Sequence, residues 1–194
     1  QQLTVLLEQI NNTLDFSQTA NNYEQPNVAA LDDSTYAVVG SRNYGGNYET
    51  VLWRCKNEYC NGNIPIGYNQ RSAAPISITN SQSVGGHETN PRATRLKNNT
   101  QKFVTVYETN KGNSSTNNNY GAKRIEAAII SYSTWVNGNN STLNDLVKEN
   151  PIVVATPVDN GTSAATPDVS GFSDGGYVVV WAQDDNIKAK LFSQ

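Results

Sequence analysis

An internal repeat is the feature that most constrains the fold of this chain. Three segments share one order of features: a proline, a short apolar stretch, a polar turn and a β-prone run led by an aromatic residue. The prolines are Pro26, Pro91 and Pro167, and the aromatic residues that follow them are Tyr36, Phe103 and Tyr177. Repetition at this spacing indicates several copies of one supersecondary unit.

Each aromatic-led run is followed by a second β-prone run, and a third precedes each proline. The second runs are 48–53, 125–132 and 187–192, and the preceding runs are 14–16, 76–78 and 152–154. β-Branched and aromatic residues dominate these runs, and Gly, Asn and Asp separate them, as is typical of strands joined by turns. The sequence therefore predicts an all-β fold of three homologous antiparallel β units, propeller-blade-like or prism-like, each of three to four strands.

We expect a single domain over residues 1–194 with long polar loops and little helix. The repeats are assigned to 14–75, 76–151 and 152–194, and 1–13 is assigned as a terminal apolar arm. A short helix is predicted over Leu143–Glu149, whereas the arm fits a helix or a strand equally well. The predicted core consists of Val28, Leu31, Tyr36, Val38, Trp53, Ile78, Phe103, Val104, Val106, Ile129, Val153, Val169, Tyr177, Val179 and Trp181.

Gly171–Trp181 reads Gly-Phe-Ser-Asp-Gly-Gly-Tyr-Val-Val-Val-Trp after the Pro167-Asp168-Val169 motif. This stretch resembles the tandem β-repeat units of large secreted bacterial and protist proteins, in which Pro-x-Val-x-x-Leu precedes Asp-Gly-Gly-aromatic-Val-Val-x-Trp. The resemblance is strong over about fifteen residues of the third repeat and weak over most of the chain. It implies short antiparallel sheets in a propeller-like or stacked arrangement.

Charge and hydropathy exclude two classes of partner. Only 16% of the residues are charged, the net charge is −3 and no basic block occurs, so nucleic acid is not an expected partner. No stretch approaches the roughly 20 apolar residues of a membrane-spanning helix. The chain contains no Met and begins Gln1-Gln2, which we interpret as a processed, secreted chain or a fragment.

The two cysteines, Cys55 and Cys60, are separated by four residues. A zinc site needs more ligands, and a thioredoxin-like redox motif needs a separation of two residues. We therefore predict a local disulfide, which fits an oxidising compartment.

Acceptor sequences for N-linked glycan, Asn-x-Ser/Thr, occur at Asn11, Asn98, Asn113, Asn139, Asn140 and Asn160. In a chain with 27 Asn, chance alone gives about four or five such sequences, so their number carries no signal. Their location does, because all but Asn11 lie in polar stretches between predicted strands, where a glycan would not disturb a sheet.

Residues with catalytic chemistry are sparse. His87 is the only histidine and is predicted to be exposed on a loop, and the pairs Asp32-Asp33 and Asp184-Asp185 fall in predicted turns. Asp174 with Asp184-Asp185 is the only acidic grouping that suggests calcium, and a turn role explains it better. We therefore expect no enzyme activity, no metal and no cofactor.

These observations lead to the hypothesis of a secreted, glycosylated structural protein of an extracellular filament or surface coat. The third repeat has no strand after it, whereas the N-terminal segment carries an unattached one, so the segment either closes onto its own third repeat or inserts into that of the next molecule. We favour head-to-tail strand addition between molecules, with the chain itself as partner. The residues expected to mediate it are Leu3, Val5, Leu7, Leu14 and Phe16. A carbohydrate-binding or adhesive module is the alternative, with sugar stacking expected on Tyr44, Tyr48, Tyr59, Tyr68 and the three Trp residues.

Overall fold

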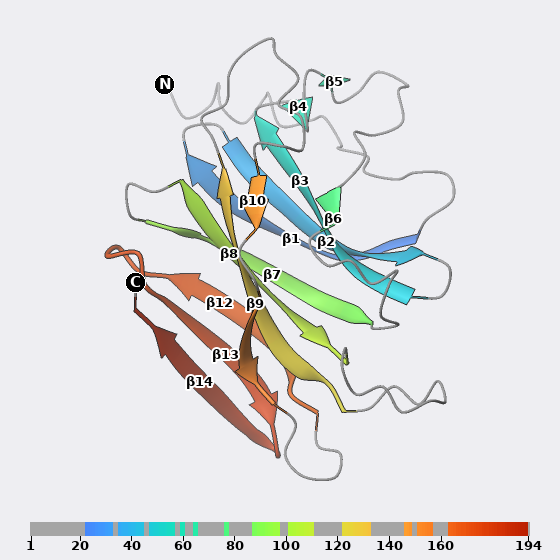
Figure 1. The fold of residues 1–194 in the computed structure, drawn as a ribbon, viewed down its shortest axis with the longest axis vertical. Coiled ribbons are helices and arrows are strands. Elements are labelled where there is room, and N and C mark those ends of the chain that lie inside the picture. Colours follow the sequence, from blue (N-terminus) through green and yellow to red (C-terminus); the bar gives the residue numbers. More distant parts are fainter. Residues whose placement is uncertain are drawn as a thin grey trace, which may run out of the picture.

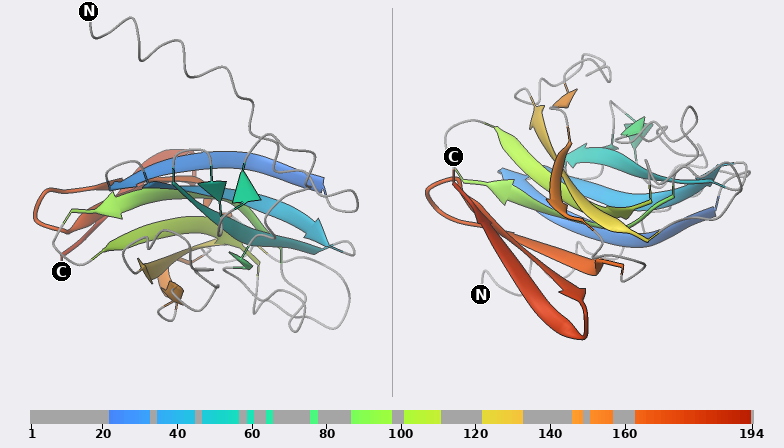
Figure 2. Two further views of the ribbon diagram at one scale, coloured as in Figure 1. Left: turned by 90° about the horizontal axis from the view of Figure 1, so that it is seen from above. Right: turned by 60° about the horizontal axis from the view of Figure 1, so that its bottom comes forward.

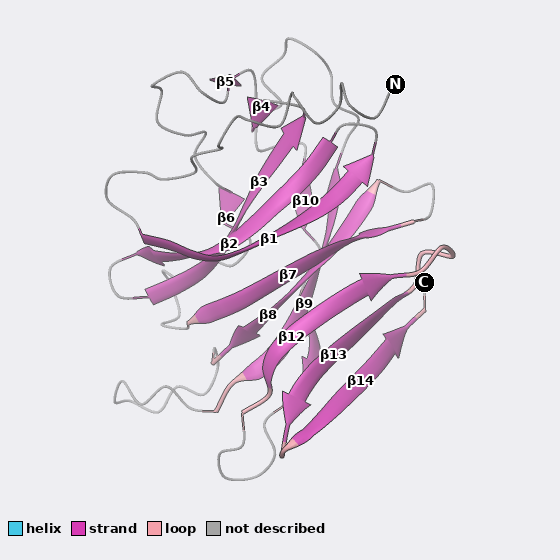
Figure 3. Ribbon diagram, turned by 180° about the vertical axis from the view of Figure 1, so that it is seen from behind, coloured by secondary structure: helices cyan, strands magenta, loops and turns pink. Residues whose placement is uncertain are grey.

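Every regular element of the chain that the structure describes is a β-strand (Figure 3). The structure, a computed structural model, describes residues 22–32, 35–44, 47–56, 59–60, 64–65, 76–77, 87–97, 101–110, 122–132, 146–148, 151–156 and 163–193. Its strands form three antiparallel sheets, none of them closed into a barrel, which confirms the predicted all-β class. Within the described residues no helix has the length and apolar character needed to cross a membrane.

Sheet 1 is built from three long strands in chain order and is completed by short strands. The long strands are β1 (Asn22–Asp32), β2 (Thr35–Tyr44) and β3 (Asn47–Lys56). The short strands are β4 (Tyr59–Cys60), β5 (Ile64–Pro65) and β6 (Ile76–Ser77). β4 and β6 both pair with the outer edge of β3, and β5 pairs with β4.

Sheet 2 repeats this arrangement. Its long strands are β7 (Glu88–Leu96), β8 (Lys102–Thr109) and β9 (Arg124–Tyr132). The short strands β10 (Leu146–Lys148) and β11 (Ile152–Ala155) pair with the outer edge of β9. The outer edge of the third strand is therefore covered in both sheets.

Sheet 3 consists of β12 (Ala165–Gly171), β13 (Tyr177–Gln183) and β14 (Asn186–Phe192). β13 and β14 are joined by Asp184 and Asp185, both at positive φ (55° and 57°), which is the backbone of a two-residue type I′ hairpin. The turn predicted at this aspartate pair is confirmed. No strand among the described residues pairs with the outer edge of β14.

The three sheets are stacked in chain order, with sheet 2 between sheets 1 and 3 (Figures 1 and 2). β7 contacts all three long strands of sheet 1, and β12 contacts all three of sheet 2. One cluster of buried residues joins sheets 1 and 2 through Leu31, Leu52, Phe103 and Tyr107, and a second joins sheets 2 and 3. Burial on both sides explains why β8 is almost entirely buried.

The strand that completes each outer edge precedes the next sheet in the chain. β6 pairs with β3 before the chain enters β7, and β11 pairs with β9 before it enters β12. The repeats assigned from the sequence as 76–151 and 152–194 begin with these short strands, and each short strand pairs with the sheet that precedes it in the chain. Each of them covers backbone groups that an open sheet edge would leave exposed.

Other predictions need correction. Leu146–Lys148 lies in β10 rather than in a helix, because pairing with the edge of β9 outweighs the weak helical preference of two turns. Val28 and Val153, predicted as core, are 62% and 42% exposed. In the run Ile152–Ala155 it is Val154 that is buried, which a run of consecutive apolar residues does not reveal.

The rest of the predicted core is placed as follows. Leu31, Val38, Trp53, Phe103, Val104, Val106, Val169, Tyr177, Val179 and Trp181 are buried. Tyr36 and Ile129 are half-buried, and Ile78 lies outside the described residues.

Candidate functional site at the sheet junctions

A bulge lies at the same place in the first strand of each sheet. The ladders shift by one residue between Glu24 and Asn27, between Thr89 and Arg92, and between Ala165 and Asp168. The residue before each proline has a positive φ: Gln25 (55°), Asn90 (53°) and Thr166 (49°). None of these is glycine, so each carries a conformational cost of about 1 kcal/mol. The three equivalent bulges show that the sheets are copies of one structural unit.

At the first junction, which joins sheets 1 and 2, the bulge of β7 directs the N–H group of Asn90 at sheet 1. The amide of Asn90 donates to Oε1 of Gln25 at 2.7 Å, and Ser41 Oγ donates to the same oxygen at 3.0 Å. Two residues past the proline, the amide of Ala93 donates to Oδ1 of Asn27 at 2.9 Å. The bulge takes the N–H group out of the hydrogen-bond ladder of its own sheet, and this group instead donates to a residue of the neighbouring sheet.

At the second junction, which joins sheets 2 and 3, the buried carboxylate of Glu108 accepts the hydrogen bond from the bulge of β12, as Gln25 does for the bulge of β7. Its Oε1 accepts from the Thr166 amide at 2.7 Å and from Asn90 Nδ2 at 2.6 Å. Its Oε2 accepts from Lys123 Nζ at 2.6 Å and from Thr89 Oγ1 at 3.0 Å. Burial by itself would raise the pKa of Glu108, but the hydrogen bonds from Lys123, Thr166 and Asn90 outweigh it, and the pKa lies below its ordinary value of 4.5.

The two junctions differ in how closely their first strands approach. Gly171 lies so close to β7 that a Cβ atom there would be 2.2 Å from the Arg95 carbonyl oxygen. Arg95 is the equivalent residue of β7, since each stands four residues after its proline. The side chain of Arg95 prevents β7 from approaching β1 as closely as β12 approaches β7. A groove of about 510 Å³ lies between β1 and β7. Val28, Ala30, Arg95 and Lys97 contribute to its lining.

The cysteines lie in sheet 1. Cys55 is buried and disulfide-bonded, and the residue opposite it across the β3–β4 pair is Cys60, the only other cysteine of the chain. No cysteine is free.

Reduction of this disulfide is expected to lower the free energy of unfolding by at most about 2 kcal/mol, because the loop that it closes is short. Alkylation followed by intact-mass measurement should add no adduct before reduction and two after it. Adducts on the native, unreduced protein would contradict the bond.

The predicted glycan and assembly residues lie outside the described residues. This holds for the sequons Asn11, Asn98, Asn113, Asn139, Asn140 and Asn160 and for the arm residues Leu3, Val5, Leu7, Leu14 and Phe16. In the sequence, the sequons from Asn98 onward all fall between described strands.

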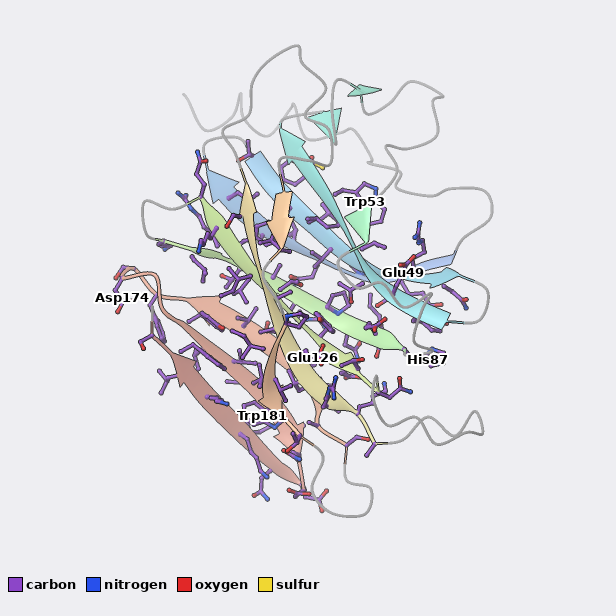
Figure 4. All side chains as sticks on the ribbon, viewed as in Figure 1. Glu49, Trp53, His87, Glu126, Asp174 and Trp181 are labelled. Carbon is purple, nitrogen blue, oxygen red and sulfur yellow. The ribbon has the colours of Figure 1, made fainter. Side chains whose placement is uncertain are left out.

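The prediction of an exposed His87 is wrong. It is half-buried, its Nδ1 accepts from the Tyr48 amide at 3.3 Å, and its own amide donates to Asn110 Oδ1 at 2.7 Å. Burial, and next the charge of Lys123, lower the pKa of His87 below 6.5. The histidine therefore packs between sheets 1 and 2 as a neutral hydrogen-bond acceptor (Figure 4).

The acidic grouping considered for calcium does not converge. Asp174 precedes β13 and Asp184 follows it, so the two lie at opposite ends of a seven-residue strand, about 23 Å apart. Asp174 Oδ1 accepts from the Gly176 amide at 2.9 Å, as a turn residue does. Asp32 ends β1, and Asp33 lies outside the described residues. The described residues contain no cluster of three or more His, Cys, Asp or Glu side chains that could hold a metal.

The aromatic residues considered for sugar stacking are not exposed where they can be placed. Trp53 and Trp181 are core residues, and Tyr48 is half-buried. Trp135, Tyr68 and the side chains of Tyr44 and Tyr59 lie outside what the structure describes.

The sequence did not lead us to predict a role for the polar residues that connect the sheets. Gln25, Asn90 and Thr166 directly precede the three repeat prolines, and this shared position was the available signal. The role of Glu108 had no such signal, since no acid occupies the equivalent positions Ser41 and Ala182. No protein-family model and no curated protein matches this sequence.

Proposed function

We propose that this chain is a secreted, glycosylated structural protein, a subunit of an extracellular filament or surface coat that assembles head to tail by strand addition. The open outer edge of β14 is the observation that carries the proposal. The corresponding edges of β3 and β9 are covered by β6 and β11, whereas no described strand covers β14. An open edge presents unpaired N–H and C=O groups and is a template for another strand.

The position of the covering strands in the chain supports a donor. β6 lies directly before β7, and β11 lies directly before β12 in the order of elements. The β-prone run Leu14-Asp15-Phe16 has the same place before β1 and has no described sheet before it. Donation of this run to β14 of the next molecule would repeat between molecules what β6 and β11 do within one. Such a contact is heterologous and generates a filament unless it closes into a ring.

Deletion of residues 1–19 tests the strand-addition mechanism. The truncated protein should sediment as a monomer at concentrations at which the full chain forms oligomers, because β14 then has no donor. A peptide of residues 1–19 should bind the truncated protein and shorten the assemblies of the full chain.

A full-length variant carrying Leu14→Asp and Phe16→Asp is the matched control for loss of chain length, and it should also remain monomeric. Assemblies of wild-type size from the truncated protein would show that strand donation is wrong.

A further inference from the structure

The two internal junctions define what a complete sheet–sheet contact requires. One half is a face of the first strand of a sheet (β7 or β12), formed by the proline of that strand and by the second residue after the proline. Pro91 and Ala93 are buried in this way at the first junction, and Pro167 and Val169 at the second. The other half is the face of the preceding sheet, across which that strand packs.

β1 carries the first half of such a contact without a sheet against it among the described residues. Pro26, Val28 and Ala30 are all exposed, and Val28 is 62% exposed. Val28 pairs with Val38, whereas its neighbour Ala29 pairs with Ala37 and lies in the core between sheets 1 and 2. Because adjacent side chains of a strand point to opposite faces, Val28 points away from sheet 2. It occupies the position that Ala93 and Val169 occupy at the internal junctions.

Sheet 3 carries the second half. Ile187, Ala189 and Leu191 of β14 pair with Ala182, Val180 and Val178 of β13, so these six apolar side chains share one face. Tyr177, Val179 and Trp181 point the other way, into the core with sheet 2. Ile187 and Leu191 are 80% and 73% exposed.

The equivalent face of sheet 2 is covered. Ile125, Ala127 and Ile129 of β9 stand at the positions of Ile187, Ala189 and Leu191 of β14, and they pack with Val104 and Val106 of β8 against sheet 3. Similar residues at the same register are therefore buried in sheet 2 and exposed in sheet 3. An exposed apolar face of this kind is typical of an interaction surface.

We propose that a second copy of this chain completes the missing junction, with its β1 packed across the outer face of sheet 3. The inference rests on the proposed head-to-tail assembly and names the surfaces that meet in it. Sheets 1 and 3 lie on opposite sides of sheet 2, so one molecule presents the two halves at opposite ends (Figures 1 and 2). The partner is therefore a copy whose β1 reaches sheet 3 of its neighbour.

This contact depends on apolar burial more than the internal junctions do. Ser41 and Glu108 support the polar links at those junctions, and Ala182 stands at their position in sheet 3. Charged substitutions of the exposed apolar residues should therefore abolish the contact, because a lysine buried there would have no partner.

Two variants test the two halves separately. Val28→Lys alters the β1 face, and Ile187→Lys/Leu191→Lys alters the sheet 3 face while leaving the backbone edge of β14 intact. Val153→Lys, on an exposed apolar residue of sheet 2, is the matched control. Circular dichroism verifies that each variant is folded, and sedimentation velocity measures assembly.

Each interface variant alone should lose all species larger than a monomer, and the control should assemble as the wild type does. An equimolar mixture of the two interface variants should form 1:1 dimers and nothing larger. The intact sheet 3 of the Val28→Lys variant can bind the intact β1 of the Ile187→Lys/Leu191→Lys variant, and the other two surfaces of the dimer are both altered. Wild-type assembly by either interface variant would overturn the stacking inference and leave strand addition standing. A wild-type chain that stays monomeric at every concentration would overturn the proposed function, and the inference with it.

Discussion

Gly171→Ala is expected to lower the free energy of unfolding by about 3 kcal/mol, the upper end of the usual cost of overpacking. The added Cβ would lie 2.2 Å from the carbonyl oxygen of Arg95, which is backbone of β7 and cannot rotate away. To accommodate it, β12 must move off sheet 2, and the hydrogen bond from the Gly171 amide to Thr94 Oγ1 (3.3 Å) would be lost. For a chain of this size the melting temperature should fall by roughly 6–12 °C.

Gly40→Ala is the matched control, because Gly40 is also a glycine within a strand, and it is buried. A Cβ there would be 3.4 Å from the Glu24 carbonyl oxygen and 3.8 Å from the Trp53 ring, which is ordinary contact. Replacing glycine also reduces the entropy of the unfolded chain, so the change should be less than about 1 kcal/mol in either direction. Equal melting temperatures for the two variants would mean that the close approach of β12 to β7 does not limit stability.

Much of each unit could be predicted from the sequence because its signals are local. Tyr177–Trp181 alternates between buried and half-buried residues within a β-branched run, and the Asp184-Asp185 pair marks the turn that follows. The aromatic-led runs predicted β2, β8 and β13 for the same reason. Alternation and turn chemistry depend on neighbours within a few residues, which a single sequence displays.

The relation between units could not be predicted, because it depends on pairing partners far along the chain. The residues of β6 and β11 read as strands, but nothing local indicates that they pair backward rather than forward. Val28 carries the same pattern as Val169, and it is exposed because no sheet among the described residues packs against that face of β1. The bulges at Gln25, Asn90 and Thr166 use three residue types, so no glycine marked the positive φ.

The interactions of Glu108 were hidden for a related reason. In the sequence it follows the apolar run Phe103–Tyr107, and an acid directly after such a run is expected to be solvated. Its four hydrogen-bond donors come from Thr89, Asn90, Lys123 and Thr166, which are distant in sequence and meet only when sheets 2 and 3 have formed.

Glu108→Gln is expected to lower the free energy of unfolding at pH 7 by about 2 kcal/mol, because the buried side chain loses charge-assisted hydrogen bonds and its donors lose an acceptor. Each carboxylate oxygen of Glu108 accepts two hydrogen bonds, so an amide must turn its NH₂ group toward two donors. The charge that pairs with Lys123, whose Nζ lies 2.6 Å from the carboxylate, is also lost. Asp184→Asn is the matched control, since it removes a partly exposed ion pair with Lys188 and should cost less than about 1 kcal/mol.

The pH dependence of the free energy of unfolding distinguishes loss of the ionised Glu108 carboxylate from a change in side-chain packing. Because the pKa of folded Glu108 lies below 4.5, its contribution to stability is complete above that pH and is lost as the pH falls through the folded pKa. Urea titrations of the wild type and of Glu108→Gln should therefore differ most at pH 7, and the difference should shrink as the pH falls below 4.5. A difference of constant size between pH 7 and pH 3 would show that the shape of the side chain, and not the ionised carboxylate, holds sheets 2 and 3 together.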